Sequence, residues 1–138
     1  MNLATLRVEG IDAALAEVTE TLALDICAEW KAGDTTWKVR TRTASGFNAT
    51  VADAENRIEL QTSIRTFLEA CRTQRISFTS LGLTAQLDVG LGVCLERQFT
   101  AGVEFMPSDL AIFSEIGLEL RISAYPCSDD ADEDASDT

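Results

Sequence analysis

The chain has 138 residues, with 11 Lys and Arg, 23 Asp and Glu and no His, so its formal net charge at pH 7 is −12. Hydrophobic residues at 46% and charged residues at 25% are typical of a globular protein, which excludes global disorder, and the length allows one domain with a core. The charge argues against direct binding to nucleic acid or to an anionic membrane surface. The missing His removes the commonest general acid–base residue and the commonest metal ligand.

The first part of the chain is predicted to form a strand and then a helix. Apolar and polar residues alternate strictly over residues 4–9, which indicates a half-buried strand. Over residues 12–24 the apolar residues recur at spacings of three and four, which indicates a helix. Glu17 and Glu20 lie away from the apolar stripe, so we expect this helix to have an acidic outer surface. Residues 25–34 lose the period and end in a Gly-Asp turn signal.

A hairpin and the clearest helix of the chain follow. Residues 36–42 alternate with one basic face and predict a strand, and Ser45-Gly46 supplies a turn. Residues 47–51 are then expected to return as the antiparallel partner of that strand. Over residues 54–73 the apolar residues follow a helical period, and Asp53 is a candidate for the N-cap.

The C-terminal part contains the strongest strand signal. Every odd-numbered residue from 81 to 95 is apolar, and a short strand is predicted at residues 103–105. Pro107 suits the first turn of a helix, Gly117 suits its end, and residues 118–125 alternate as a last strand. The predicted order is therefore β-α-β-β-α-β-β-α-β. It indicates an α+β fold with a mixed or antiparallel sheet and helices packed on one face, near the split βαβ or ferredoxin-like class.

The chain is expected to divide into a single α+β domain over residues 1–127 and an acidic C-terminal tail over residues 128–138. The tail sequence SDDADEDASDT holds six acids and no large apolar side chain. One interpretation is a disordered, solubilising tail; the other is a polyanion that docks in the basic groove of a partner. A calcium loop is not expected, because the glycine at the sixth position and the terminal glutamate of such loops are missing.

The cysteines and the sequence motifs offer no catalytic apparatus. Cys27, Cys71, Cys94 and Cys127 are irregularly spaced without a CxxC pair, so we expect small buried hydrophobes rather than disulfides or a zinc site. The sequence also lacks a Gly-rich phosphate loop and a GxSxG elbow. We therefore expect no enzymatic activity, no cofactor and no metal. The N-terminus does not resemble a signal peptide, and no apolar run is long enough for a membrane span, so a cytoplasmic location is expected.

The two tryptophans lie in one segment, AEWKAGDTTWKVR, among basic residues. Trp30 and Trp37 in that context suggest a stacking patch for nucleic acid, which the overall charge argues against. Two alternatives remain: a core or sheet-edge residue, and an exposed aromatic anchor at a protein interface.

Several short motifs, taken in their order along the chain, resemble a bacterial family. The motifs are Lys31-Ala32-Gly33-Asp34 after the first helix, Ser45-Gly46-Phe47 in the hairpin, Thr66-Phe67-Leu68 in the next helix, and Pro107-Ser108-Asp109-Leu110, Ile116-Gly117-Leu118 and Tyr125 near the end. Over roughly residues 3–126 the chain resembles the family known as domain of unknown function 4279. Phe47 stands where the family pattern prefers Trp, and Ala124 replaces a residue that is often polar. The resemblance implies a small cytoplasmic protein of the kind encoded beside polymorphic toxins as immunity proteins, and it carries over no catalytic residue.

The leading hypothesis is therefore a non-enzymatic immunity protein that binds a cognate toxin with a basic surface. Either Trp30 or Trp37 is expected to be an anchor, and the expected electrostatic contacts are Asp129, Asp130, Asp132, Glu133 and Asp134. The alternative is a phosphate-mimicking inhibitor of a nucleic-acid-binding defence protein. A third hypothesis is an enzyme or small-ligand binder that uses the open face of the sheet, and a deep, carboxylate-lined pocket would favour it.

Overall fold

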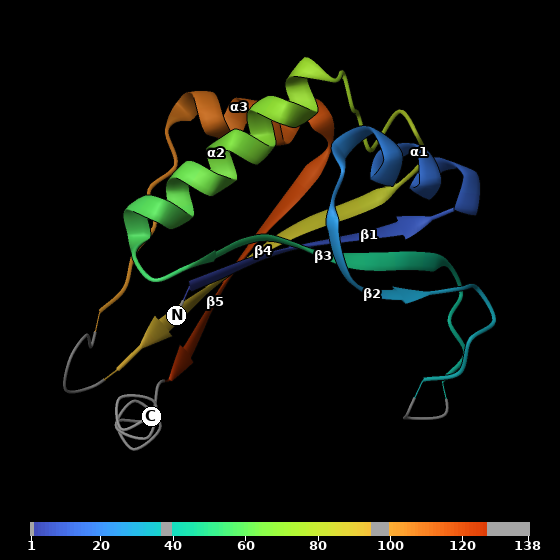
Figure 1. The fold of residues 1–138 in the computed structure, drawn as a ribbon, viewed down its shortest axis with the longest axis horizontal. Coiled ribbons are helices and arrows are strands. Elements are labelled where there is room, and N and C mark those ends of the chain that lie inside the picture. The colour runs from blue at the N-terminus through green and yellow to red at the C-terminus, as the bar shows by residue number, and fades with distance from the viewer. Residues whose placement is uncertain (1, 37–39, 95–99, 127–138) are drawn as a thin grey trace.

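The computed structural model describes residues 2–36, 40–94 and 100–126, which form eight helices and strands (Figure 1). In chain order they are β1 (Asn2–Gly10), α1 (Asp12–Leu22), β2 (Asp25–Trp30), β3 (Ser45–Ala54), α2 (Arg57–Thr73), β4 (Thr84–Val93), α3 (Pro107–Ile116) and β5 (Leu118–Pro126). Within these ranges, none of the helices has the length and apolarity needed to cross a bilayer.

The five strands form one mixed sheet in the order β2-β3-β1-β4-β5. All neighbouring pairs are antiparallel except β4 and β5, which are parallel. The first six elements have the split βαβ arrangement, because β3 lies between β1 and β2, the two strands that α1 connects. The unit of α3 and β5 then adds a parallel strand outside β4. Figure 1 shows the helices on one side of the sheet, so the predicted α+β class with helices on one face is confirmed.

The core lies between this sheet and the helix layer. In β1 the alternate residues Ala4, Leu6 and Val8 are fully buried, which confirms the half-buried strand expected from the alternation. In α2 the apolar stripe is buried along the helix, at Leu60, Ile64, Phe67, Leu68 and Cys71. The largest fully buried side chain is Phe78, in the segment between α2 and β4.

The hairpin differs from the prediction. The partner of β3 is β2, at residues 25–30, where the loss of period predicted irregular structure. Residues 36–42 form no strand in their described part and contribute only an isolated bridge between Thr35 and Thr41. The reason is that β2 is an exposed edge strand with a register shift between Ile26 and Ala28, so burial does not impose a strict alternation on it.

Two smaller predictions are also wrong. Residues 103–105 form no strand, because the backbone N–H of Glu104 donates to Oε1 of Gln61 on α2 at 2.8 Å instead of to the sheet. The N-cap of α2 is Asn56, whose side chain accepts from the N–H of Glu59 at 2.9 Å, whereas Asp53 lies within β3.

The three described cysteines differ in burial. Cys71 and Cys94 are buried, as expected, whereas Cys27 is exposed on edge strand β2, so that prediction is wrong for Cys27. Cys127 lies outside the described residues. Burial raises the pKa of the Cys71 thiol to about 12, so this group stays protonated at neutral pH and is not a nucleophile.

Candidate functional site

The face of the sheet opposite the helices, here called the open face, is formed by the side chains that alternate with the core residues. Strand register places these side chains in rows across β3, β1, β4 and β5. The rows are Asn48–Arg7–Gln86–Glu119, Thr50–Thr5–Asp88–Arg121 and Asp53–Leu3–Gly90–Ser123. Antiparallel sheets commonly leave one face to solvent, and such a face is available for a partner.

One end of the open face carries an exposed apolar cluster, the Tyr125 patch, which consists of Leu3, Gly90 and Tyr125. A Cβ added at Gly90 would lie 2.6 Å from Cε2 of Tyr125, so the phenol ring lies directly against the Gly90 backbone. Gly90 is paired with Leu3 on β1, and the side chains of Leu3 and Tyr125 are 37% and 56% exposed. An aromatic ring held in place yet open to solvent is typical of an interface anchor.

Sequence reasoning identified Tyr125 as the end of the last strand and as part of a motif, but not as an anchor. The signal that could have found it is Gly90 inside a strand pattern, because a strand glycine often marks a close approach of another group.

Charged side chains are spread along the strands of the open face, and Asp53, the partner of Leu3, and Asp88 are the acids nearest to this patch. Among the described strand residues of the open face, the acidic ones outnumber the basic ones; the acids are Glu9, Asp25, Asp53, Asp88 and Glu119, and the bases are Arg7 and Arg121. The Ser123 hydroxyl donates to Oδ1 of Asp88 at 3.0 Å, which fixes that carboxylate beside the Tyr125 patch.

The other end of the open face is filled by Trp30, the last residue of β2. Its indole is only 8% exposed and packs on Gly46, where an added Cβ would lie 2.6 Å from Cζ2. The guanidinium groups of Arg7 and Arg42 lie 4.9 and 4.5 Å from the ring centroid, which are cation–π distances. The buried Nε1 has no hydrogen-bond partner among the described residues.

The burial of its indole decides between the two roles considered for Trp30, a sheet-edge residue and an exposed anchor. Trp30 is a sheet-edge residue packed inside the molecule, so the expectation of an exposed anchor is wrong for it: Gly46 and two arginines cover the ring. Trp37 lies outside the described residues. The expected contacts of the acidic tail, Asp129, Asp130, Asp132, Glu133 and Asp134, also lie outside them.

A hollow on the open face measures about 130 Å³ and is lined by Arg7, Glu9, Thr84, Gln86 and Glu119. Pockets that enclose drug-sized ligands usually measure about 300–1,000 Å³. Two carboxylates line this hollow, but it does not have the depth that would favour the hypothesis of an enzyme or small-ligand binder.

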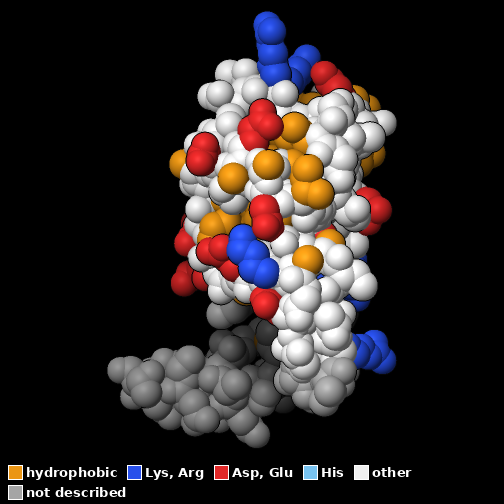
Figure 2. Space-filling model, turned by 90° about the vertical axis from the view of Figure 1, so that its right-hand side faces the viewer, with side chains coloured by type: hydrophobic (Ala, Val, Ile, Leu, Met, Phe, Trp, Pro, Cys, Tyr) orange, Lys and Arg blue, Asp and Glu red, His pale blue; other side chains and the backbone are white. Residues whose placement is uncertain are grey.

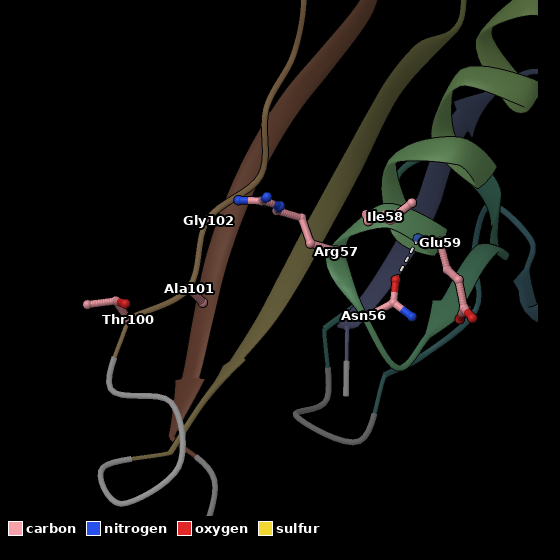
Figure 3. A pocket seen from close by; sticks show the side chains of 7 residues that line it. All are labelled: Asn56, Arg57, Ile58, Glu59, Thr100, Ala101 and Gly102. Atoms are coloured by element: carbon pink, nitrogen blue, oxygen red, sulfur yellow. Dashed lines mark hydrogen bonds between the residues drawn. The ribbon is translucent and has the colours of Figure 1, made fainter.

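A second hollow, of about 820 Å³, lies where α2 begins, against residues 100–102. Figure 3 shows that its polar side chains diverge: Arg57 reaches toward Gly102, whereas Asn56 and Glu59 point to the other side of the helix. Ligand sites are recognised by polar groups that converge. We therefore place the candidate site on the open face and not in this hollow.

The side of the molecule that carries α1 and β2 is also acidic, with red side chains among exposed apolar ones (Figure 2). Glu17 and Glu20 are exposed there, which confirms the acidic outer surface expected for α1. Asp12 forms an ion pair of 3.5 Å with Lys31. The pKa of the Asp12 carboxyl is lowered, mainly by a hydrogen bond with Ser45 and to a smaller extent by the positive charge of Lys31.

Comparison of the chain with protein-family models, with curated proteins and with solved structures found no match.

Proposed function

We propose that this protein is a non-enzymatic immunity protein that binds and neutralises a cognate bacterial toxin. The observation that carries the proposal is the Tyr125 patch, an exposed aromatic anchor on an open sheet face in which acidic residues predominate. A partner with a basic surface complements this face, and the net charge of −12 accelerates its approach by electrostatic steering. The resemblance to the family of domain of unknown function 4279 supports this assignment, and with it a cytoplasmic site of action.

In this mechanism the apolar and charged residues have separate roles. Tyr125 enters a pocket of the toxin and supplies most of the affinity, since buried aromatic anchors dominate protein interfaces. Asp88, Asp53 and Glu119 face basic side chains at the rim. The acids of the tail begin at Asp129, four residues after Tyr125 in the sequence.

The first test is the affinity for the product of the neighbouring gene, the expected toxin, measured by biolayer interferometry. We expect Tyr125→Ala to raise Kd about 30-fold or more, because loss of an interface anchor costs about 2 kcal/mol or more. The matched control is Ile58→Ala, which truncates a 71% exposed side chain at the start of α2, away from the open face. An unchanged Kd for Tyr125→Ala would contradict this binding site, and failure of the wild-type protein to bind the toxin would contradict the proposed function.

The acidic tail is tested by association kinetics. Replacing the tail acids Asp129, Asp130, Asp132, Glu133, Asp134 and Asp137 by Asn or Gln should lower the association rate at low salt and leave it almost unchanged at high salt, because salt screens steering. A rate that does not change at low salt would remove the tail from the mechanism.

The second candidate function is a phosphate-mimicking inhibitor of a nucleic-acid-binding defence protein. The six acids of the tail favour it, because such a run resembles a row of phosphates. Growth assays separate the two functions. Rescue of cells that express the neighbouring toxin supports immunity, whereas protection of a phage from a nucleic-acid-binding defence protein, without such rescue, supports mimicry.

A further inference from the structure

The two edges of the sheet are protected to different degrees. Edge strand β2 has six residues, a register shift and charged side chains at Asp25 and Glu29. Natural proteins use short strands, bulges and charges in this way to prevent edge-to-edge association. Edge strand β5 has nine residues and pairs with β4 in unbroken register over its whole length. Among residues 2–36, 40–94 and 100–126, no strand pairs with its outer edge.

The side chains of β5 leave this edge exposed. Ile122, on the helix side of the strand, is 52% exposed although it is a β-branched residue suited to a buried sheet. Glu119 and Arg121 flank Leu120 and lie on the open face, with opposite charges two residues apart. An exposed, continuous strand with this pattern is a template for another strand.

The charge pattern identifies a partner strand that fits. In a two-fold antiparallel pair centred on Leu120, Glu119 of each copy lies opposite Arg121 of the other. The same register pairs residues 118–122 of the two copies and places Leu118 opposite Ile122 on the helix side. A pair centred on Arg121 would instead set two arginines opposite each other, and one centred on Ile122 would leave Glu119 opposite Tyr125. Charge complementarity therefore selects a second copy of this chain in the register centred on Leu120.

We propose that β5 pairs with β5 of a second copy, so that two five-stranded sheets join into one continuous sheet of ten strands. The two-fold axis is perpendicular to such a sheet, so both open faces lie on the same side. The two C-terminal ends of β5 point in opposite directions.

The experiment uses the full chain alone, by sedimentation equilibrium over a range of concentrations. The wild-type protein should approach about 30 kDa, twice its mass of 15.0 kDa. Arg121→Glu should raise the dimer dissociation constant about tenfold or more, because it sets like charges opposite each other at two positions. The double variant Glu119→Arg/Arg121→Glu swaps the charges and should restore the dissociation constant to within about threefold. Arg72→Glu makes the same charge change on an exposed residue of α2 and should have no effect.

Three results would overturn the proposal. One is a mass of 15.0 kDa at every concentration, the second is a dimer that Arg121→Glu leaves unchanged, and the third is a charge-swapped double variant that stays monomeric. Glu119→Arg alone must weaken the dimer as Arg121→Glu does. Agreement between the two single variants shows that the effect is not caused by misfolding of one of them. No toxin is present, so the outcome is independent of the proposed immunity function.

Discussion

Trp30→Ala is expected to lower the free energy of unfolding by about 3–5 kcal/mol, the range seen when a large buried aromatic side chain is truncated. The indole is 8% exposed and lies against Gly46, whose missing Cβ provides the space for it. Truncation leaves this space empty and removes two cation–π contacts, from Arg7 and Arg42. Urea denaturation followed by circular dichroism measures the change.

Trp30→Phe separates the contribution of the ring from that of its N–H group. It keeps most of the aromatic body and removes Nε1, a buried donor without a described partner. An unpaired buried donor costs about 1–3 kcal/mol, so its removal offsets part of the lost packing. We therefore expect Trp30→Phe to cost less than about 1.5 kcal/mol. Equal losses for Phe and Ala would contradict the unpaired state of Nε1.

These variants also separate stability from binding. Because Trp30 is covered, it supports the end of the open face without offering its ring to a partner. Well below the unfolding transition, Trp30→Phe should leave the Kd for the toxin within about twofold, whereas Tyr125→Ala should change Kd and leave stability almost unaltered. A large loss of affinity in Trp30→Phe would restore Trp30 as an interface residue.

The contrast between Trp30 and Tyr125 shows where sequence reasoning ends. Composition can indicate that a tryptophan is either core or anchor, but the choice depends on what lies across the neighbouring strand. Gly46 is 16 residues away in the sequence, and it reaches Trp30 only through the pairing of β2 with β3. The exposure of Tyr125 also depends on the pairing of strands. Its ring lies on Gly90 of β4, and no further strand covers it because β5 is at the edge of the described sheet.

The elements themselves were predictable where burial imposes a period. The stripe of α2 and the alternation of β1 are direct consequences of a helix or strand with one face in the core. Strand β2 was not predictable in this way, because an exposed, bulged edge strand has no buried face to enforce the pattern. The basic alternation of residues 36–42 predicts a strand instead, although the described part of that segment forms none.

Gly117→Ala is expected to be the second large loss of stability, because two effects act on one methyl group. Gly117 ends α3 with φ of 71° and ψ of 41°, in the left-handed region that costs a non-glycine residue about 1 kcal/mol. A Cβ at this position would also overlap the Thr79 side chain, and such overpacking costs about 1–3 kcal/mol. The expected total is about 2–4 kcal/mol.

Gly82→Ala separates these two effects, because Gly82 has nearly the same φ, 72°, and no atom within 4 Å of an added Cβ. It should therefore lose only about 1 kcal/mol. In a Thr79→Ala background the cost of Gly117→Ala should fall toward the Gly82 value; equal costs at both glycines in the wild-type background would contradict the overlap.

The contact between Gly117 and Thr79 also positions the site, because the N–H of Phe78 donates to the carbonyl of Ile116 at 2.8 Å beside it and β5 begins at the next residue after Gly117. We expect a shift at Gly117 to displace β5 and with it Tyr125, so Gly117→Ala should weaken toxin binding as well as stability, whereas Gly82→Ala should leave the affinity unchanged.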